Sequence, residues 1–216
     1  PTTPQLRALV GNPDVYAVQH DDGTWHPVRE PLTAAVIRRH REGELTVGTY
    51  IVKPPDLART LVFDIDDKDE AEQDRKTTAI ARILNALGID YGVEFSGRKG
   101  YHVWVVSGDY MPAATLYQLG RGVREEAELP DLEVFPKQVE VRDLGNLVKL
   151  PGGVHRVTGK ANDFISNVPG LMDADFLTEA AANYPEVGLR GKRADAPMVV
   201  EYPCVHSIQD GVKEGG

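Results

Sequence analysis

The chain has 216 residues, of which 41% are hydrophobic and 26% charged, as is ordinary for a globular protein. Its formal net charge of −9 argues against tight, autonomous binding to nucleic acid, because proteins that bind it usually carry a basic surface. No stretch approaches the roughly 20 apolar residues of a membrane span. A single cysteine, Cys204, excludes an internal disulfide framework and a cysteine-rich zinc site, and it favours a reducing, cytoplasmic location.

The first 58 residues predict a small α/β portion. Apolar and polar residues alternate on both sides of the Asp21–Asp22 turn, which predicts a β-hairpin. A helix and one more strand follow, and Pro54–Pro55 ends this strand. The predicted elements are strands over 15–20, 23–28 and 47–52 and a helix over 31–43.

The central part of the chain predicts the order β-α-β-β-α-β, which is the split βαβ or ferredoxin-like arrangement. Its predicted strands are 60–66, 91–96, 101–106 and 132–135, and its predicted helices are 69–87 and 112–129. We expect the first and third strands to be central, parallel neighbours and the fourth strand to lie beside the first. The sequence therefore predicts an α+β protein in which the N-terminal α/β portion packs against this sheet.

The rest of the chain predicts a strand over 146–151 and a helix over 173–183. The composition of 189–197 indicates a linker. The segment after it resumes a helical beginning, so we expect 189–216 to hold a linker and the start of a truncated C-terminal helical module.

Two aspartates, Asp64 and Asp66, end the first central strand. Because side chains alternate along a strand, both carboxylates project from one face, about 7 Å apart. Oxygen ligands of this kind favour Mg²⁺ or Mn²⁺; the alternative is an acidic strand end that faces solvent. Glu133 and Glu140 are both open as a third acid. Topology favours Glu133, because the fourth strand is antiparallel to the first and begins beside the aspartates.

The turn between the second and third central strands combines glycine, cations and histidine. Its residues of interest are Ser96, Gly97, Arg98, Lys99, Gly100 and His102. Glycines permit turn angles that leave N–H groups facing an anion, and the cations add positive charge. The alternative is a basic turn with a histidine at the edge of the core. On parallel neighbours, the aspartates and His102 would lie near opposite ends, a gap that a nucleoside triphosphate can bridge.

Four segments, in this order, resemble motifs of the archaeo-eukaryotic primase superfamily, in particular its primase-polymerases. They are DID (64–66), SGRKGYHVWV (96–105), LEVFPKQ (132–138) and GNLVKLPGGVHRVTGK (145–160). The second segment has one residue more between Ser96 and His102 than the family's SxxGxH pattern. The resemblance covers about residues 15–165.

The resemblance implies a primase-polymerase catalytic domain over 1–188, with an N-terminal subdomain over about 1–58 and an RRM-like palm over about 59–165. The implied activity is template-dependent nucleotidyl transfer, which makes or extends primers from nucleoside triphosphates in DNA replication. Asp64, Asp66 and Glu133 would be catalytic and hold two Mg²⁺ or Mn²⁺ ions. The implied nucleotide-binding residues are Ser96, Arg98, Lys99, Gly100, His102, Lys149 and His155, with Arg156 as an alternative to His155.

The implied partners are a single-stranded DNA template with its primer and, in a longer protein, a helicase or C-terminal helical module. Since the chain is acidic, we expect weak template binding through Arg38, Arg39 and the basic surface of 137–160.

Two other classes of protein remain alternatives. An aspartate-nucleophile phosphatase also ends a strand with DxD, but it needs a doubly wound parallel sheet. A non-catalytic, RRM-like module for single-stranded nucleic acid needs exposed aromatic side chains for base stacking, and only 7% of the residues are aromatic. It also leaves the aspartate pair without a purpose.

Overall fold

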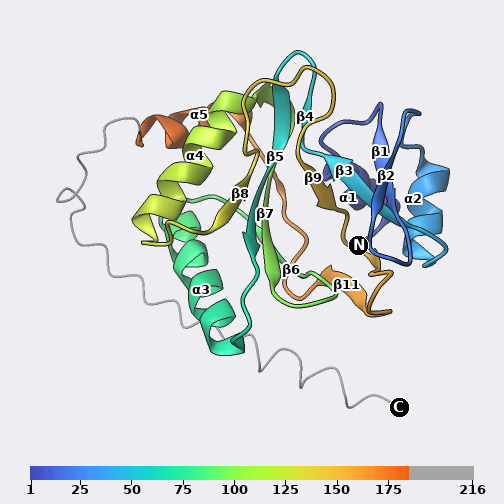
Figure 1. The fold of residues 1–216 in the computed structure, drawn as a ribbon. Helices are drawn as coiled ribbons and strands as arrows, with labels where there is room; N and C mark the ends of the chain where they lie inside the picture. The colour runs from blue at the N-terminus through green and yellow to red at the C-terminus, as the bar shows by residue number, and fades with distance from the viewer. Residues whose placement is uncertain (185–216) are drawn as a thin grey trace.

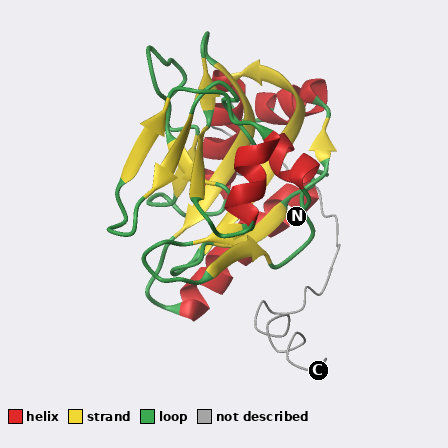
Figure 2. Ribbon diagram, turned by 90° about the vertical axis from the view of Figure 1, so that its right-hand side faces the viewer, coloured by secondary structure: helices red, strands yellow, loops and turns green. Residues whose placement is uncertain are grey.

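Two β-sheets lie side by side in the computed structural model of the chain, which describes residues 1–184 (Figure 1). The smaller sheet, called the N-terminal sheet below, has the strand order β2-β1-β3-β9. The larger, called the palm sheet, has the order β10-β11-β6-β7-β5-β4, with β8 paired to β5 and β12 paired to β7. Figure 2 views the molecule from the side on which the N-terminal sheet lies.

The N-terminal sheet contains the predicted hairpin and one strand from far along the chain. Its elements are α1 (Thr3–Ala8), β1 (Tyr16–Gln19), β2 (Trp25–Val28), α2 (Ala34–Arg41), β3 (Thr46–Tyr50) and β9 (Leu147–Lys149). The side chain of Thr33 accepts a hydrogen bond from the Val36 backbone and caps the start of α2. Because β9 pairs with β3, the predicted strand over 146–151 completes this sheet rather than the palm sheet.

The palm sheet has the predicted ferredoxin-like order, with β8, β5, β7 and β6 as consecutive neighbours. Its first elements are β4 (Val52–Lys53), β5 (Leu57–Ile65), α3 (Glu70–Ala86), β6 (Gly92–Phe95), β7 (Tyr101–Pro112), α4 (Ala113–Glu126) and β8 (Glu133–Phe135). Asp69 caps α3 by accepting from the Ala71 backbone. The α+β fold class is therefore confirmed, and the antiparallel core strands do not form the doubly wound parallel sheet that the phosphatase alternative needs.

The direction predicted for the two central strands is wrong. β5 and β7 are antiparallel, and Asp64 lies directly opposite His102. The reason is that the crossover through α3 returns the chain in the direction of β5, and the β6–β7 hairpin then reverses it. The end of β5 and the start of β7 consequently lie at the same edge, so the aspartates and the histidine are adjacent rather than separated.

Helices α3, α4 and α5 (Ala174–Ala182) cover one face of the palm sheet, and the N-terminal sheet lies on the other side (Figure 1). Leu61 and Phe63 of β5 are fully buried on the helical face, where Leu61 meets Gly120 of α4. Alternation along β5 therefore turns Asp64 toward the N-terminal sheet. The fold thus places the carboxylate between the two sheets.

The sequence did not predict α1 or the short strands β10 (Gly153–Val154), β11 (Ala161–Phe164) and β12 (Leu171–Met172). The single strand predicted over 47–52 is divided between β3 of the N-terminal sheet and β4 of the palm sheet. The predicted linker and helical module over 189–216 lie outside the described residues. Within residues 1–184, no helix is both long and apolar enough to cross a membrane.

Candidate active site

Four ionisable side chains lie in a row across the face of the palm sheet that looks toward the N-terminal sheet. In the strand register, Glu133 of β8 is opposite Asp64, Asp64 is opposite His102, and His102 is opposite Glu94 of β6. Directly opposite residues of antiparallel strands project from the same face as close neighbours. The fold therefore brings three carboxylates and one imidazole into line from four different strands.

A pocket of about 230 Å³ opens over this row, between the two sheets. Eight of the predicted site residues line it: Asp64, Asp66, Ser96, Arg98, Lys99, His102, Lys149 and His155. The remaining lining side chains are Gln19, Trp25, Phe135, Leu147 and Val148. Charged and polar groups thus come mainly from the palm sheet and the 149–155 segment, while β2 and β9 add an apolar wall.

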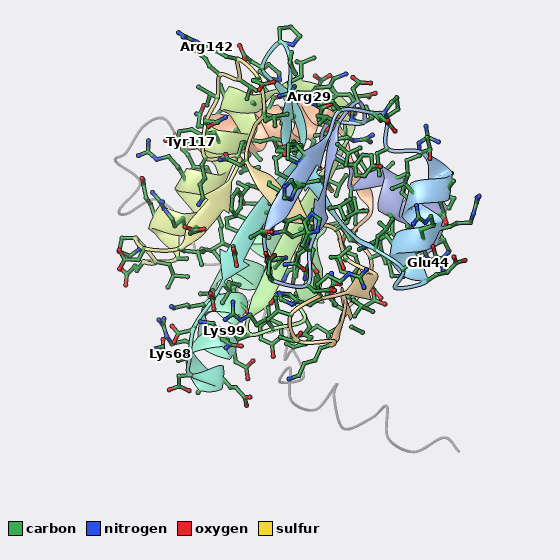
Figure 3. The ribbon with its side chains drawn as sticks, turned by 45° about the vertical axis from the view of Figure 1, so that its right-hand side comes forward. Arg29, Glu44, Lys68, Lys99, Tyr117 and Arg142 are labelled. Atoms are coloured by element: carbon green, nitrogen blue, oxygen red, sulfur yellow. The ribbon has the colours of Figure 1, made fainter. Side chains whose placement is uncertain are left out.

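The hairpin turn from Ser96 to Gly100 is closed by its own hydrogen bonds. The Ser96 backbone N–H donates to the carbonyl of Gly100 (3.1 Å), and its hydroxyl donates to the carbonyl of Lys99 (2.8 Å). Gly97 and Gly100 both adopt positive φ angles, 82° and 84°. Arg98 and Lys99 are therefore exposed at the tip of a defined turn. Figure 3 labels Lys99.

Lys99 connects the hairpin to the aspartates. Its Nζ lies 3.0 Å from Oδ1 of Asp66, and both side chains are about half exposed. A similar ion pair joins Lys137 Nζ to Glu133 Oε2 at 2.8 Å. Two of the three predicted metal-binding carboxylates are thus paired with a lysine.

His102 lies between two carboxylates. Its Nδ1 is 2.9 Å from Glu94 Oε2, and its Nε2 is 3.5 Å from Asp64 Oδ1. Burial disfavours the charged imidazole, but attraction to Glu94 and Asp64 outweighs it and raises the pKa of His102 to about 9. For Asp64, the His102 partner likewise outweighs burial and lowers the pKa. The structure therefore presents a positively charged imidazole at neutral pH.

Lys149 joins the two sheets beneath the pocket. It extends from β9, its Nζ donates to the carbonyl oxygen of Ser96, and its side chain is buried. Burial lowers the pKa of Lys149, while Glu94 and Asp64 oppose that shift. Lys149 thus holds the hairpin against the N-terminal sheet and adds positive charge close to Asp64.

His155 and Arg156 have different environments. Burial, together with the positive charge of Lys149 and Arg98, lowers the pKa of His155, so this ring is neutral at pH 7. Arg156 donates to the carbonyl oxygens of Gly43 and Glu44, and it does not line the pocket. Of the two alternatives that the sequence left open, His155 is the one that reaches the pocket.

The two candidates for a third acid also differ in position. Glu133 is in register with Asp64, although its side chain lies beside the pocket rather than in its lining. Glu140 is exposed in the segment between β8 and β9 and does not line the pocket. The position of Glu133 is therefore the one compatible with a site shared with Asp64.

The three carboxylates fit a hard divalent cation in their chemistry, since all their donor atoms are oxygen. Over residues 1–184, however, no three carboxylate, imidazole or thiolate side chains converge as a ready-made metal site. Asp66 and Glu133 form ion pairs with Lys99 and Lys137 in this structure. A metal would have to replace these lysines as the positive partner.

The sequence profile of one family, described as "TOTE conflict system, Archaeo-Eukaryotic Primase domain", matches residues 23–173, well over half of the chain. The chain belongs to this family. It is thus an archaeo-eukaryotic primase domain, and primase-polymerases of this superfamily are metal-dependent nucleotidyltransferases. The match confirms the resemblance to the archaeo-eukaryotic primase superfamily that the four sequence motifs indicated.

One solved structure agrees with this family assignment at the level of the fold. The primase-polymerase domain of cyanophage S-2L matches with a TM-score of 0.51 and 15% identity, over 82% of this primase domain and 93% of that chain. The primase RepB′ gives a TM-score of 0.47 and 15% identity over 83% and 60% of the two chains. The catalytic domain of RepB′ in complex with initiator DNA gives a TM-score of 0.47 and 14% identity, over 87% of this chain and 95% of that chain. A comparison with curated protein sequences finds no match.

Sequence reasoning missed two sets of residues around the site of the primase domain. Trp25 and Leu147 reach the pocket only because β2 and β9 belong to the sheet that faces the palm, a long-range pairing without a local signal. Glu94 was missed although a signal exists. It is a carboxylate at an inward position of a short apolar strand, which is rarely found without a charged partner.

Gly100 provides a prediction for the hairpin of this domain. A Cβ at Gly100 would overlap the carbonyl oxygen of Ile65, next to Asp66, and the φ angle is also unfavourable for alanine. Gly100→Ala should therefore lower the free energy of unfolding by about 3 kcal/mol. Gly159→Ala is the matched control, because its φ is positive (68°) but nothing lies within 4 Å of the added Cβ. It should cost about 1 kcal/mol. Equal losses in urea denaturation would contradict the close approach at Gly100.

Proposed function

We propose that this primase domain is a template-dependent nucleotidyltransferase, a DNA primase-polymerase that makes or extends primers from nucleoside triphosphates. The observation that carries the proposal is the juxtaposition of Asp64 and His102, which are directly opposite in the palm sheet and share one pocket. An acidic group suited to metal and a cationic group suited to phosphate thus meet within a few ångströms.

Asp64, Asp66 and Glu133 are the residues that would hold two Mg²⁺ or Mn²⁺ ions. Such ions would lower the pKa of an attacking 3′-hydroxyl and neutralise charge on the triphosphate. The carboxylates would exchange Lys99 and Lys137 for the ions, and both lysines would then be free to contact phosphate. Lys99 is the better placed of the two, because it lines the pocket.

The nucleotide would lie with its phosphates on the palm side and its base toward the N-terminal sheet. His102, Lys99 and Arg98 supply positive charge, and the N–H groups of the Gly97–Gly100 turn supply neutral donors. Ser96 would act mainly through the shape of the turn, since its hydroxyl is bonded within it. His155 and Lys149 would complete the phosphate side, and Trp25 with Leu147 offers an apolar surface for the base.

The remaining parts of the proposal concern partners and setting. A single-stranded DNA template and its primer would be bound weakly by this domain alone, because the chain carries a net charge of −9. Arg39 is already paired with Glu44 at 2.8 Å, which reduces its contribution. A helicase or helical module in a longer protein would strengthen the complex. The family description favours a conflict system as the setting, and a role in DNA replication stays a prediction.

The proposal is tested by primer extension and by de novo primer synthesis on a single-stranded DNA template, with either Mg²⁺ or Mn²⁺. Ribonucleotides and deoxyribonucleotides are supplied in separate reactions. The proposal predicts elongated products that require a template, a nucleotide and a divalent ion. A protein that binds DNA but yields no product with any combination would instead support the non-catalytic binding module.

His102→Ala should weaken nucleotide binding by about tenfold or more, because a charge-assisted contact to phosphate is lost. Isothermal titration calorimetry with ATP or dATP measures the affinity. His26→Ala serves as control, since His26 is exposed on β2 and does not line the pocket. Unchanged affinity in His102→Ala would remove the histidine from the phosphate site.

A further inference from the structure

Glu94 is a completely buried carboxylate that the proposed chemistry does not use. Its side chain is fully inaccessible to solvent in the middle of β6, and it does not line the pocket. Burying a carboxylate is unfavourable by several kcal/mol unless partners compensate it. The position of this charge under the pocket therefore calls for a reason beyond packing.

Three side-chain donors surround Glu94. The indole Nε1 of Trp104 donates to Oε2 at 2.7 Å, and His102 Nδ1 lies 2.9 Å from the same oxygen. The amide of Asn162 donates to Oε1 at 2.9 Å. An ionised carboxylate can only accept hydrogen bonds, so the imidazole proton of this pair resides on Nδ1 of His102.

This cluster is also rigid. The Asn162 amide donates a second hydrogen bond, to the carbonyl of Leu150 at 2.8 Å, and Trp104 and Asn162 are both fully buried. The carboxylate is consequently fixed from β7 on one side and β11 on the other. With Nδ1 held by this fixed acceptor, the His102 ring cannot turn, and Nε2 must face Asp64 and the pocket.

We propose that Glu94 is a positioning residue for nucleotide binding: it fixes the His102 ring with Nδ1 turned inward and Nε2 presented to the pocket, where a phosphate oxygen accepts from it. This inference rests on the proposed function, because it assigns His102 a phosphate ligand. The geometry follows the general pattern in which a second group orients an imidazole by binding its other nitrogen. Glu94 itself touches neither nucleotide nor metal in this arrangement.

The orientation of His102 can be measured in the wild-type protein without any ligand. Nitrogen-15 NMR of the imidazole groups, with the His102 signals assigned from a His102→Gln variant, reports whether Nδ1 carries hydrogen and how fast this hydrogen exchanges with water. The proposal predicts a proton on Nδ1 that exchanges slowly with water. An unprotonated Nδ1, or a ring that averages between both orientations, would overturn it whether or not the protein binds nucleotide.

Glu94→Gln tests the consequence for binding. The amide keeps the size of the side chain, but it offers one acceptor oxygen to three donors, so the contact to His102 is weakened. ATP and dATP affinities, measured by calorimetry in the presence of Mg²⁺, should fall about tenfold or more, and the His102 Nδ1 signal should shift.

Thr77→Val is the matched control for a purely structural role. Thr77 is buried in α3, on the other side of the palm sheet, and its hydroxyl donates to the carbonyl of Gln73. The isosteric change should lower thermal stability, as we also expect for Glu94→Gln, but leave nucleotide affinity within about twofold.

The outcomes separate this inference from the proposed function. Wild-type protein that binds nucleotide, combined with unchanged affinity and unchanged His102 signals in Glu94→Gln, would overturn the positioning role alone. Wild-type protein that binds no nucleotide would overturn the proposed function, and the NMR result on the ligand-free protein would still decide how Glu94 holds His102.

Discussion

Replacement of both Asp64 and Asp66 by alanine should reduce nucleotide incorporation by on the order of 10³-fold or more, because the site would lose the carboxylates that hold the metal ions. Primer extension with Mg²⁺ and with Mn²⁺ measures the loss. The fold should persist, since Asp64 is partly exposed and Asp66 lies after the end of β5 at the surface.

The control for this double variant must match its change of charge. The chain carries a net charge of −9, so loss of any two carboxylates would favour association with DNA. Asp109→Ala/Asp175→Ala makes the same change at exposed positions of β7 and α5 that do not line the pocket. It should retain wild-type incorporation. Comparable activity of the Asp64/Asp66 variant and this control would contradict metal-dependent transfer at the aspartate pair.

The second large effect is expected at the third acid. Glu133→Gln keeps the shape of the side chain but removes its charge, and it should reduce incorporation by about 10²-fold or more. The reason is positional: Glu133 lies opposite Asp64 on the neighbouring strand, whereas Glu140 lies in an exposed segment beyond β8. Glu140→Gln, with the same loss of charge, should therefore behave like the wild type.

The same two glutamine variants would give the opposite result if Glu140 were the third acid. Full incorporation by Glu133→Gln together with a large loss in Glu140→Gln would assign the third carboxylate to Glu140. That result would require Glu140 to approach the Asp64 end of β5 when metal binds, because the segment after β8 contacts Asp56, next to the opposite end of this strand. Titration of Mn²⁺ followed by electron paramagnetic resonance gives a second readout, because only the variant that lacks a metal ligand should bind the ion more weakly.

The order of the palm strands could be predicted because local patterns determine it. Alternation along the predicted strand over 60–66 indicated that Asp64 and Asp66 lie on one face, and both line the pocket. The glycine-rich turn identified the β6–β7 hairpin. The predicted parallel orientation of β5 and β7 was wrong, because the β6–β7 hairpin reverses the direction of the chain. In the antiparallel arrangement, His102 lies directly beside Asp64, so the two groups belong to one continuous site.

Other features of the site depend on contacts between distant parts of the chain. The bond from Lys149 to Ser96 forms because β9 returns to the N-terminal sheet and reaches across to the palm. The burial of Glu94 depends on Asn162, which lies 68 residues later in β11. Neither contact has a local sequence pattern. The sequence therefore indicated that Lys149 and His102 belong to the site, but not which groups orient their side chains.

The central claim is that the residues of the pocket around Asp64 and His102 catalyse template-dependent nucleotidyl transfer. Single-nucleotide incorporation tests it most directly, with four primer–template duplexes that differ only in the first unpaired template base and with each nucleotide supplied in turn. Product and released pyrophosphate are quantified together. The account predicts incorporation of the complementary nucleotide opposite each base, with one pyrophosphate released per nucleotide added. Absence of product with both Mg²⁺ and Mn²⁺, or incorporation that is independent of the template base, would contradict it.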